Sequence, residues 1–256
     1  MKLKQLLFAS AISVAICTQT AMAQTPRWLD PQVNRVNTEK PRSSFFAYES
    51  ESLAKKGVKE ESNRFLSMEG TWKFRFCKDH NLAPKNFFLP DYDDTLWDKF
   101  PVPGLFEMNG YGDKIYKNVG YAWATQFASN PPHVEEKNNY TGSYRRTFNI
   151  PAQWKGDRIY VHVGSATSNL TLWVNGKEVG YSEDSKLAAE FDITKYVVPG
   201  QKATIAMQVM RWCDGSYGED QDFWRFTGIA REVYMYARPA AHIQDLFVTA
   251  GLTNNY

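Results

Sequence analysis

Two polar segments of the sequence carry the side chains best suited to hold a ligand. Residues 110–121 contain Asn118, and residues 211–228 contain two tryptophans and four carboxylates in a stretch that we expect to be too polar for a strand. The carboxylates are Asp214, Glu219, Asp220 and Asp222. Carboxylates gathered in one loop repel one another and destabilise the fold unless they bind a cation, pair with arginine or accept hydrogen bonds from backbone N–H groups. Because Arg211 and Arg225 bracket the run, internal ion pairing competes with a site for a hard cation or for sugar hydroxyls.

The aromatic content of 15% permits two interpretations. Aromatic side chains suit the pleated surface of a β-rich core, and their flat faces also stack on the apolar faces of pyranose rings. We favour core packing for the composition as a whole, and for Trp212 and Trp224 in particular. The four histidines are scattered, so no Cys/His metal centre is expected. We expect Cys77 and Cys213 to be two separate core residues rather than a disulfide.

The first 23 residues have the features of a signal peptide. Lys2 and Lys4 precede an apolar run over residues 6–17, and Ala21-Met22-Ala23 is a small-x-small cleavage site. The run is shorter than the about 20 residues of a permanent membrane anchor. We therefore expect export to the periplasm or the medium, with no membrane partner. Loss of Lys2 and Lys4 leaves 28 basic against 28 acidic side chains, which argues against nucleic acid as a partner.

Alternating apolar residues predict a series of short strands that position the two polar segments. The clearest are residues 71–76, 143–150, 158–163, 168–174, 177–182, 191–193, 203–210 and 231–237. Asn175-Gly176 supplies the two positive-φ residues of a type I′ hairpin turn. Because no long amphipathic helix accompanies the strands, the pattern predicts an all-β fold, a jelly-roll β-sandwich over residues 63–239.

The remaining residues are expected to surround that sandwich. Residues 24–62 should form an irregular, extended N-terminal arm with a short helix at 50–59, and residues 82–103 should be mostly loop. Residues 242–249 look like a strand that opens a following, truncated domain over residues 240–256. Without its signal peptide the 256-residue chain keeps 233 residues. A (β/α)8 barrel takes about 250 residues, so it cannot accompany the sandwich in this chain.

At these segments the sequence resembles a known family, the N-terminal domain of bacterial β-galactosidases of glycoside hydrolase family 2. The resemblance covers roughly residues 28–245. Its main motifs are Met108-Asn-Gly-Tyr-Gly, Ile115-Tyr-Lys-Asn-Val, Leu172-Trp-Val-Asn-Gly-Lys-Glu-Val-Gly-Tyr-Ser-Glu-Asp-Ser-Lys and Arg211-Trp-Cys-Asp-Gly-Ser-Tyr. The resemblance implies a jelly-roll domain, similar to galactose-binding domains, that reaches into the active site of a separate barrel.

The resemblance also implies roles for two residues. Asn118 matches the asparagine that contacts the galactosyl group, and Asp222 matches the aspartate that binds a sodium ion and the region of the galactosyl 6-hydroxyl. An amide can donate to and accept from a hydroxyl, and sodium prefers oxygen ligands. Asp214 and Asp220 are then structural, holding the loop against the neighbouring arginines.

Family members are retaining glycosidases, which use two glutamates. The resemblance places that pair, a magnesium ion and the remaining sodium ligands in the barrel, which this chain lacks. Glu219 and Asp222 form a poor acid/base pair, because no apolar pocket is evident to raise either pKa. We therefore expect a truncated substrate-binding domain of a β-galactosidase. This domain should bind a β-galactoside and should be inactive alone. Two alternatives stay open: a free-standing exported carbohydrate-binding module, and a fragment that docks on a separately encoded catalytic remainder. A homo-oligomer of the full-length enzyme is a further possible assembly.

Overall fold

The computed structural model describes residues 25–219 and 222–253. The predicted signal peptide and Asp220 lie outside these residues. Within the described part of the chain, no helix has the length and apolar character that a membrane crossing requires.

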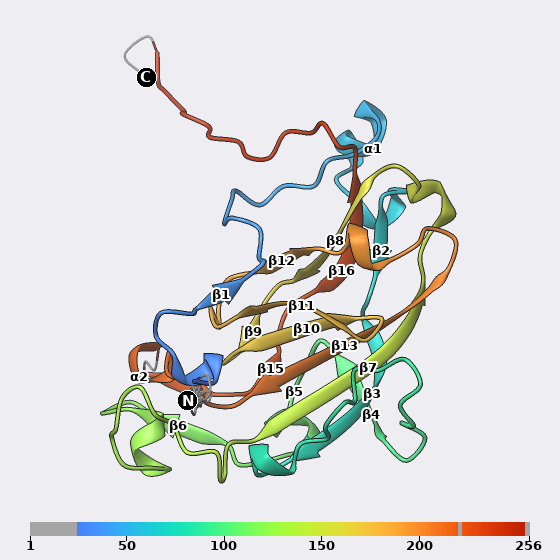
Figure 1. Cartoon of the computed structure of the whole chain (residues 1–256). Helices are drawn as coiled ribbons and strands as arrows, with labels where there is room; N and C mark the ends of the chain where they lie inside the picture. The colour runs from blue at the N-terminus through green and yellow to red at the C-terminus, as the bar shows by residue number, and fades with distance from the viewer. Residues whose placement is uncertain (1–24, 220–221, 254–256) are drawn as a thin grey trace, which may run out of the picture.

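Two antiparallel sheets pack face to face, and they form the predicted all-β sandwich with a jelly-roll architecture (Figure 1). The larger sheet contains, in spatial order, β1 (Arg35–Val36), β11 (Lys177–Ser182), β10 (Leu170–Val174), β13 (Lys202–Met210), β7 (Thr141–Asn149), β3 (Gly70–Cys77) and β4 (Asp98–Val102). The smaller sheet contains β12 (Ala189–Asp192), β8 (Arg158–Val163), β16 (Val233–Arg238) and β2 (Phe65–Ser67).

Short elements complete the fold. Five further strands form two small sheets: β5 (Gly104–Leu105), β15 (Gly228–Ile229) and β9 (Ala166–Thr167) in one, β6 (Ile115–Lys117) and β14 (Phe223–Arg225) in the other. The α-helices are α1 (Glu51–Lys56) and α2 (Ser216–Glu219). Single 3-10 turns occur at Arg27–Leu29, Lys59–Glu61, His80–Leu82, Glu107–Asn109, Ala122–Thr125, Ala152–Trp154 and Thr194–Tyr196.

The core lies between the two large sheets. Alternate residues of β13, Ile205, Met207 and Val209, are fully buried and meet Val161 and Met235 of the smaller sheet in one apolar cluster. Each such side chain contributes about 1.5–3 kcal/mol by leaving water. Of the 38 aromatic residues, 19 are buried in the described part of the chain, and nearly all of these lie in apolar clusters, which agrees with the β-rich-core interpretation of the composition.

The local strand signals are confirmed with small changes at their ends. Residues 158–163 form β8 with the predicted bounds, and residues 203–210 form β13 with one residue added. Asn175 and Gly176 join β10 to β11 with φ of 50° and 81°, the positive values that a type I′ turn needs.

One segment agrees with expectation over most of its length, and another does not. Residues 82–103, predicted as mostly loop, end in β4, the outermost strand of the larger sheet. Pro101 is tolerated there because an edge strand does not need every N–H for pairing. The expectation of a strand at residues 242–249 was wrong, since the described residues 239–253 contain no helix or strand. They run away from the sandwich as an extended segment that pairs with no strand (Figure 1).

Contacts with the sandwich hold parts of the N-terminal arm, residues 24–62, in place. β1 pairs with β11 and extends the larger sheet. The predicted helix is α1, shorter than expected, and Ser50 caps it by accepting the N–H of Leu53 on its Oγ at 3.3 Å. Further along the arm, Arg42 Nη2 lies 2.9 Å from a carboxylate oxygen of Glu190 on β12, and both side chains are about nine-tenths buried. The arm is therefore attached to both sheets.

Candidate functional site: a two-stranded ribbon and a buried carboxyl group

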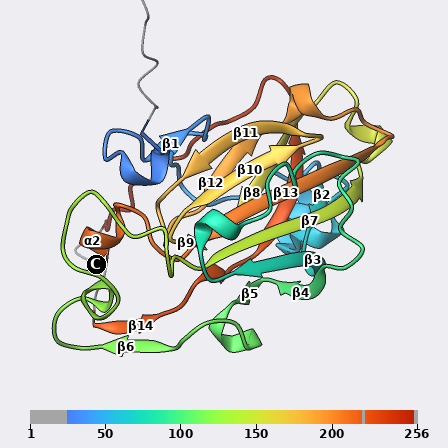
Figure 2. The same cartoon turned by 60° about the horizontal axis from the view of Figure 1, so that its bottom comes forward.

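The two polar segments come together as a two-stranded ribbon beside the sandwich (Figure 2). Strand β14 pairs antiparallel with β6, with Trp224 opposite Tyr116. Continued by one residue, this register sets Asp222 opposite Asn118. The structure thus brings the two predicted site residues to the same end of one ribbon. The expectation that residues 211–228 contain no strand was wrong, because aromatic residues at 223–224 and a partner strand stabilise β14.

Asp222 is exposed and is oriented by a neighbour that the sequence reasoning missed. The hydroxyl of Tyr116 donates to Asp222 Oδ1 at 3.1 Å. This bond and the carboxylate charge raise the pKa of Tyr116. Asn118 is exposed too. A carboxylate accepts through four lone-pair positions, and an amide both donates and accepts. The ribbon end can therefore offer oxygen ligands to a cation and hydrogen bonds to hydroxyl groups.

Two buried arginines hold the backbone beneath the ribbon. Arg225 Nη2 donates to the carbonyl oxygen of Arg211 at 2.7 Å, and its guanidinium lies 4.6 Å from the ring centroid of Trp212. Arg211 Nη2 donates to the carbonyl oxygen of Asp113 at 2.7 Å. Among the described residues, no ion pair joins Arg211 to Asp214. Arg211 therefore holds the backbone of residues 110–121 instead of neutralising Asp214.

Glu219 has a structural role, because its carboxylate accepts hydrogen bonds from another loop. Ser185 donates to its carboxylate from the backbone N–H at 3.1 Å and from the hydroxyl. Burial raises the pKa of Glu219, so the expectation that nothing would raise it was wrong. Because Ser185 engages both carboxylate oxygens, Glu219 ties α2 to the loop after β11.

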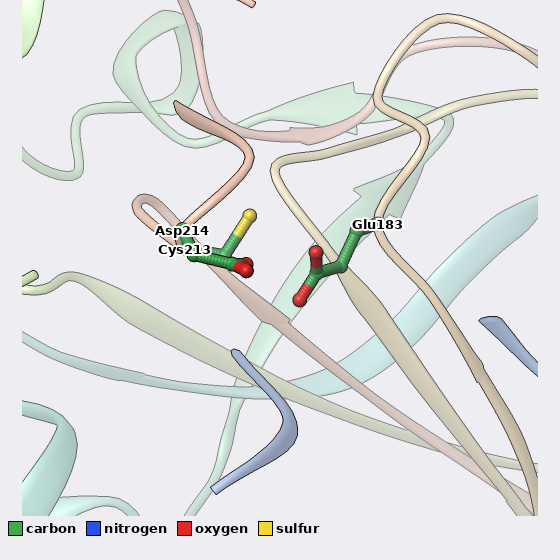
Figure 3. A group of neighbouring side chains, drawn as sticks. All are labelled: Glu183, Cys213 and Asp214. Carbon is green, nitrogen blue, oxygen red and sulfur yellow. The ribbon is translucent and has the colours of Figure 1, made fainter. Parts of the chain in front are cut away.

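A second group of side chains, the Glu183–Cys213–Asp214 group, was not foreseen. These three residues are buried, and their potential ligand atoms lie within 4.8 Å of one another. Figure 3 shows the Glu183 side chain pointing toward Asp214 and Cys213. A cavity of about 420 Å³ adjoins the group, lined by Pro31, Asn34, Pro131, Pro132, Glu183, Asp214 and Gly215. Sequence spacing gives no signal for it, because Glu183 follows β11 and the other two follow β13.

The environment of this group favours the protonated forms of the Glu183 carboxyl and the Cys213 thiol. Burial, opposed by a hydrogen bond from Tyr181 and reinforced by Asp214, raises the pKa of Glu183 to about 9. Burial raises the pKa of the Cys213 thiol to about 12. A metal ion bound here would have to displace both protons, which weakens its binding near neutral pH. In its protonated form Glu183 instead links the end of β11 to the segment before α2.

The tryptophans and cysteines divide between core and surface. Trp212 is 1% exposed, as expected, but Trp224 is 49% exposed, so the expectation of core packing was wrong for it. Trp224 lies on the outward face of the ribbon, whereas the next residue, Arg225, is buried. Both cysteines are free, as expected. Cys213 is a core residue, but Cys77 is only half-buried and lies outside the apolar clusters, so the expectation of a core position was wrong for Cys77.

Comparisons with known proteins agree on one family. The model of the glycosyl hydrolases family 2 sugar binding domain matches residues 65–239. The β-galactosidase of Priestia megaterium is 39% identical over 232 residues, 90% of this chain and 22% of that protein. The β-galactosidase large subunit of Leuconostoc lactis is 36% identical over 234 residues, 86% of this chain and 36% of that subunit. The chain thus spans about a fifth to about a third of the length of these relatives.

A solved structure matches the architecture. The crystal structure of a Bacteroides uniformis β-glucuronidase superposes with a TM-score of 0.51 and 23% identity, covering 69% of this chain and 18% of that one. At this identity the likeness bears on the fold alone.

Proposed function

Because this chain belongs to the glycosyl hydrolases of family 2, as their sugar-binding domain, we propose that it binds the terminal galactosyl unit of β-galactosides as the substrate-binding domain of a β-galactosidase. The observation that carries the proposal is the juxtaposition of Asn118 and Asp222 at one end of the β6/β14 ribbon. The pairing of β6 with β14 brings these two residues together across a sequence separation of 104 positions. An exposed amide beside an exposed carboxylate suits a ligand rich in hydroxyl groups.

Sodium is the proposed cofactor of this site. Asp222 supplies one oxygen ligand, and its orientation is fixed by the Tyr116 hydroxyl. One carboxylate does not satisfy a cation that takes about six oxygen ligands, so in this chain the ion would take its other ligands from the sugar and from water, which a further domain could replace in a longer protein. The two catalytic glutamates and a magnesium ion are proposed to lie in a barrel outside these 256 residues. The 256-residue chain alone is then inactive.

The second candidate function is a fragment that docks on a separately encoded catalytic remainder. The β-galactosidase named as a large subunit in Leuconostoc lactis is a relative of this chain. The extended segment over residues 242–252 also exposes large apolar residues, among them Phe247 at 96%. Such residues suit burial against a further domain or a partner. In either case we propose export, on the basis of the sequence features of residues 1–23.

The experiment is a calorimetric titration with galactose in sodium and in potassium buffer. Binding should saturate in sodium, weaken in potassium and be lost in Asp222→Ala. Asp91→Ala, which removes an exposed carboxylate from the loop before β4, is the matched control and should bind normally. Binding that is insensitive to Asp222→Ala, or no binding in sodium, contradicts the proposed site.

A further inference from the structure

One face of the β6/β14 ribbon gathers all the side chains proposed to meet the sugar. Side chains two positions apart on a strand point to the same side. Tyr116 and Asn118 therefore share a face on the β6 side, and Asp222, Trp224 and Phe226 share one on the β14 side. The Tyr116–Asp222 hydrogen bond and the Tyr116–Trp224 ring contact join these into a single face.

The aromatic half of this face is open to solvent. Tyr116 is 50% exposed and Trp224 is 49% exposed, with ring centroids 5.4 Å apart. Phe226 lies nearly parallel to Trp224, with centroids 5.6 Å apart and planes at 10°. Phe226 thus stacks on one face of the Trp224 indole, and Tyr116 is tilted against Trp224 at 41°. The part of Trp224 that these neighbours leave open, together with the exposed Tyr116 ring, forms a grouped apolar surface of the kind that marks binding sites.

The opposite face holds these rings in place. Arg225, between Trp224 and Phe226 in sequence, is 3% exposed and packs over the indole of Trp212 in the interior. Trp212 is itself 1% exposed. The ribbon is therefore anchored from below, so that the exposed rings are preorganised before a ligand arrives.

We propose that Trp224, with Tyr116 beside it, forms a stacking subsite for a pyranose ring whose hydroxyl edge faces Asn118 and Asp222. The inference rests on the proposed function and names the apolar contact of that same site. A pyranose has C–H groups on one face and hydroxyls around its edge. It therefore needs an aromatic surface next to polar acceptors, and this ribbon provides both: Asn118 lies two positions after Tyr116, and Asp222 lies two positions before Trp224.

Tyr116 has a second part in this subsite. Its ring extends the aromatic surface, while its hydroxyl sets the direction of the Asp222 carboxylate. Tyr116 is thus a positioning residue as well as a contact. Tyr116→Phe keeps the ring and removes only the hydrogen bond, so it separates the two roles.

The test measures the affinity of the 256-residue chain for methyl β-D-galactoside in sodium buffer, by the shift of indole N–H signals in NMR spectra. Trp224→Phe identifies the Trp224 signal and keeps an aromatic ring. We expect Trp224→Ala to bind about five- to tenfold more weakly and Trp224→Phe to lose about twofold, the range of one aromatic contact. Tyr116→Phe should weaken binding and reduce its sodium dependence.

Val198→Ala is the matched control. Val198 is 55% exposed and precedes β13, at the end of that nine-residue strand opposite to Arg211. The strand spans about 30 Å, so Val198→Ala should leave both the affinity and the Trp224 signal unchanged. Circular dichroism and thermal unfolding of each variant establish that it is folded.

The outcomes separate the two proposals. If the wild-type chain binds the galactoside and Trp224→Ala binds it equally well, the stacking subsite is refuted while the proposed function stands. If the folded wild-type chain does not bind the galactoside at all, the proposed function fails and the subsite with it. A shift of the Trp224 signal on binding, together with the graded losses in Ala and Phe variants, supports the subsite.

Discussion

Replacing Glu183 by glutamine should make the free energy of unfolding less dependent on pH between about 4.5 and about 9, for a reason set by the Glu183–Cys213–Asp214 group. In the folded chain burial raises the pKa of Glu183 to about 9, from an ordinary value of 4.5. In the unfolded chain the carboxyl ionises at the ordinary value. Between these two pKa values the folded state retains a proton that the unfolded state has lost. The free energy of unfolding therefore falls as the pH rises through this window.

The size of this change in stability follows from the single proton that Glu183 holds in the folded state. One proton difference changes the free energy of unfolding by at most about 1.4 kcal/mol per pH unit. Between pH 6 and pH 8 the wild-type chain should lose up to about 3 kcal/mol through this group. Glutamine cannot ionise, yet it has nearly the same size, can accept from the Tyr181 hydroxyl and can donate to the Asp214 carboxylate. Glu183→Gln should therefore remove this loss without creating a cavity.

The assay is urea unfolding of the wild-type and Glu183→Gln chains at pH 6, 7 and 8, followed by tryptophan fluorescence. The stability of the variant relative to the wild type should rise with pH, by roughly 1–3 kcal/mol across the series. Other buried carboxyls with raised pKa, such as Glu107, are present in both chains and cancel in the difference. Glu178→Gln, on the same strand β11 but exposed, is the control and should follow the wild type. Parallel curves for wild type and Glu183→Gln would refute the reasoning.

Two further predictions concern the arm and the cysteines. Arg42→Met leaves the buried Glu190 carboxylate without its bidentate partner. Urea unfolding should therefore show that the free energy of unfolding falls by about 3–5 kcal/mol. A fall below about 1 kcal/mol would contradict this reasoning and would mean that water reaches Glu190. In a chain lacking residues 1–23, a thiol reagent should modify Cys77 slowly and Cys213 not at all in the folded state, and should modify both in urea. The absence of any reactive thiol in urea without reductant, as a Cys77–Cys213 disulfide would give, would contradict free cysteines.

The sandwich could be predicted because its signals are local. The Asn175-Gly176 turn and the alternation over residues 203–210 each lie within one hairpin or one strand, and the structure reproduces both. Residues 242–249 carry a similar alternation without forming a strand, because a strand also needs a neighbour to receive its hydrogen bonds. Propensity alone is therefore insufficient at the end of this chain.

The candidate site depends on contacts that are distant in sequence. The three-residue strand β14 exists because β6, more than 100 positions earlier, pairs with it and because Arg225 is buried beneath it. Resemblance to relatives identified Asn118 and Asp222, but only the structure places them on one ribbon. The exposure of Trp224 and the burial of Glu183 are properties of the assembled sheets, so no local pattern could indicate them.

The most direct test of the central claim is a saturation-transfer NMR measurement on lactose mixed with the 256-residue chain in sodium buffer, followed over several hours. Saturation should reach the protons of the galactosyl ring more strongly than those of the glucose ring, because the galactosyl ring is proposed to lie on the ribbon. The lactose should also remain intact, since the proposed catalytic residues lie outside this chain. Absence of transfer to the galactosyl protons, or accumulation of free galactose and glucose, would contradict a domain that binds the sugar without cleaving it.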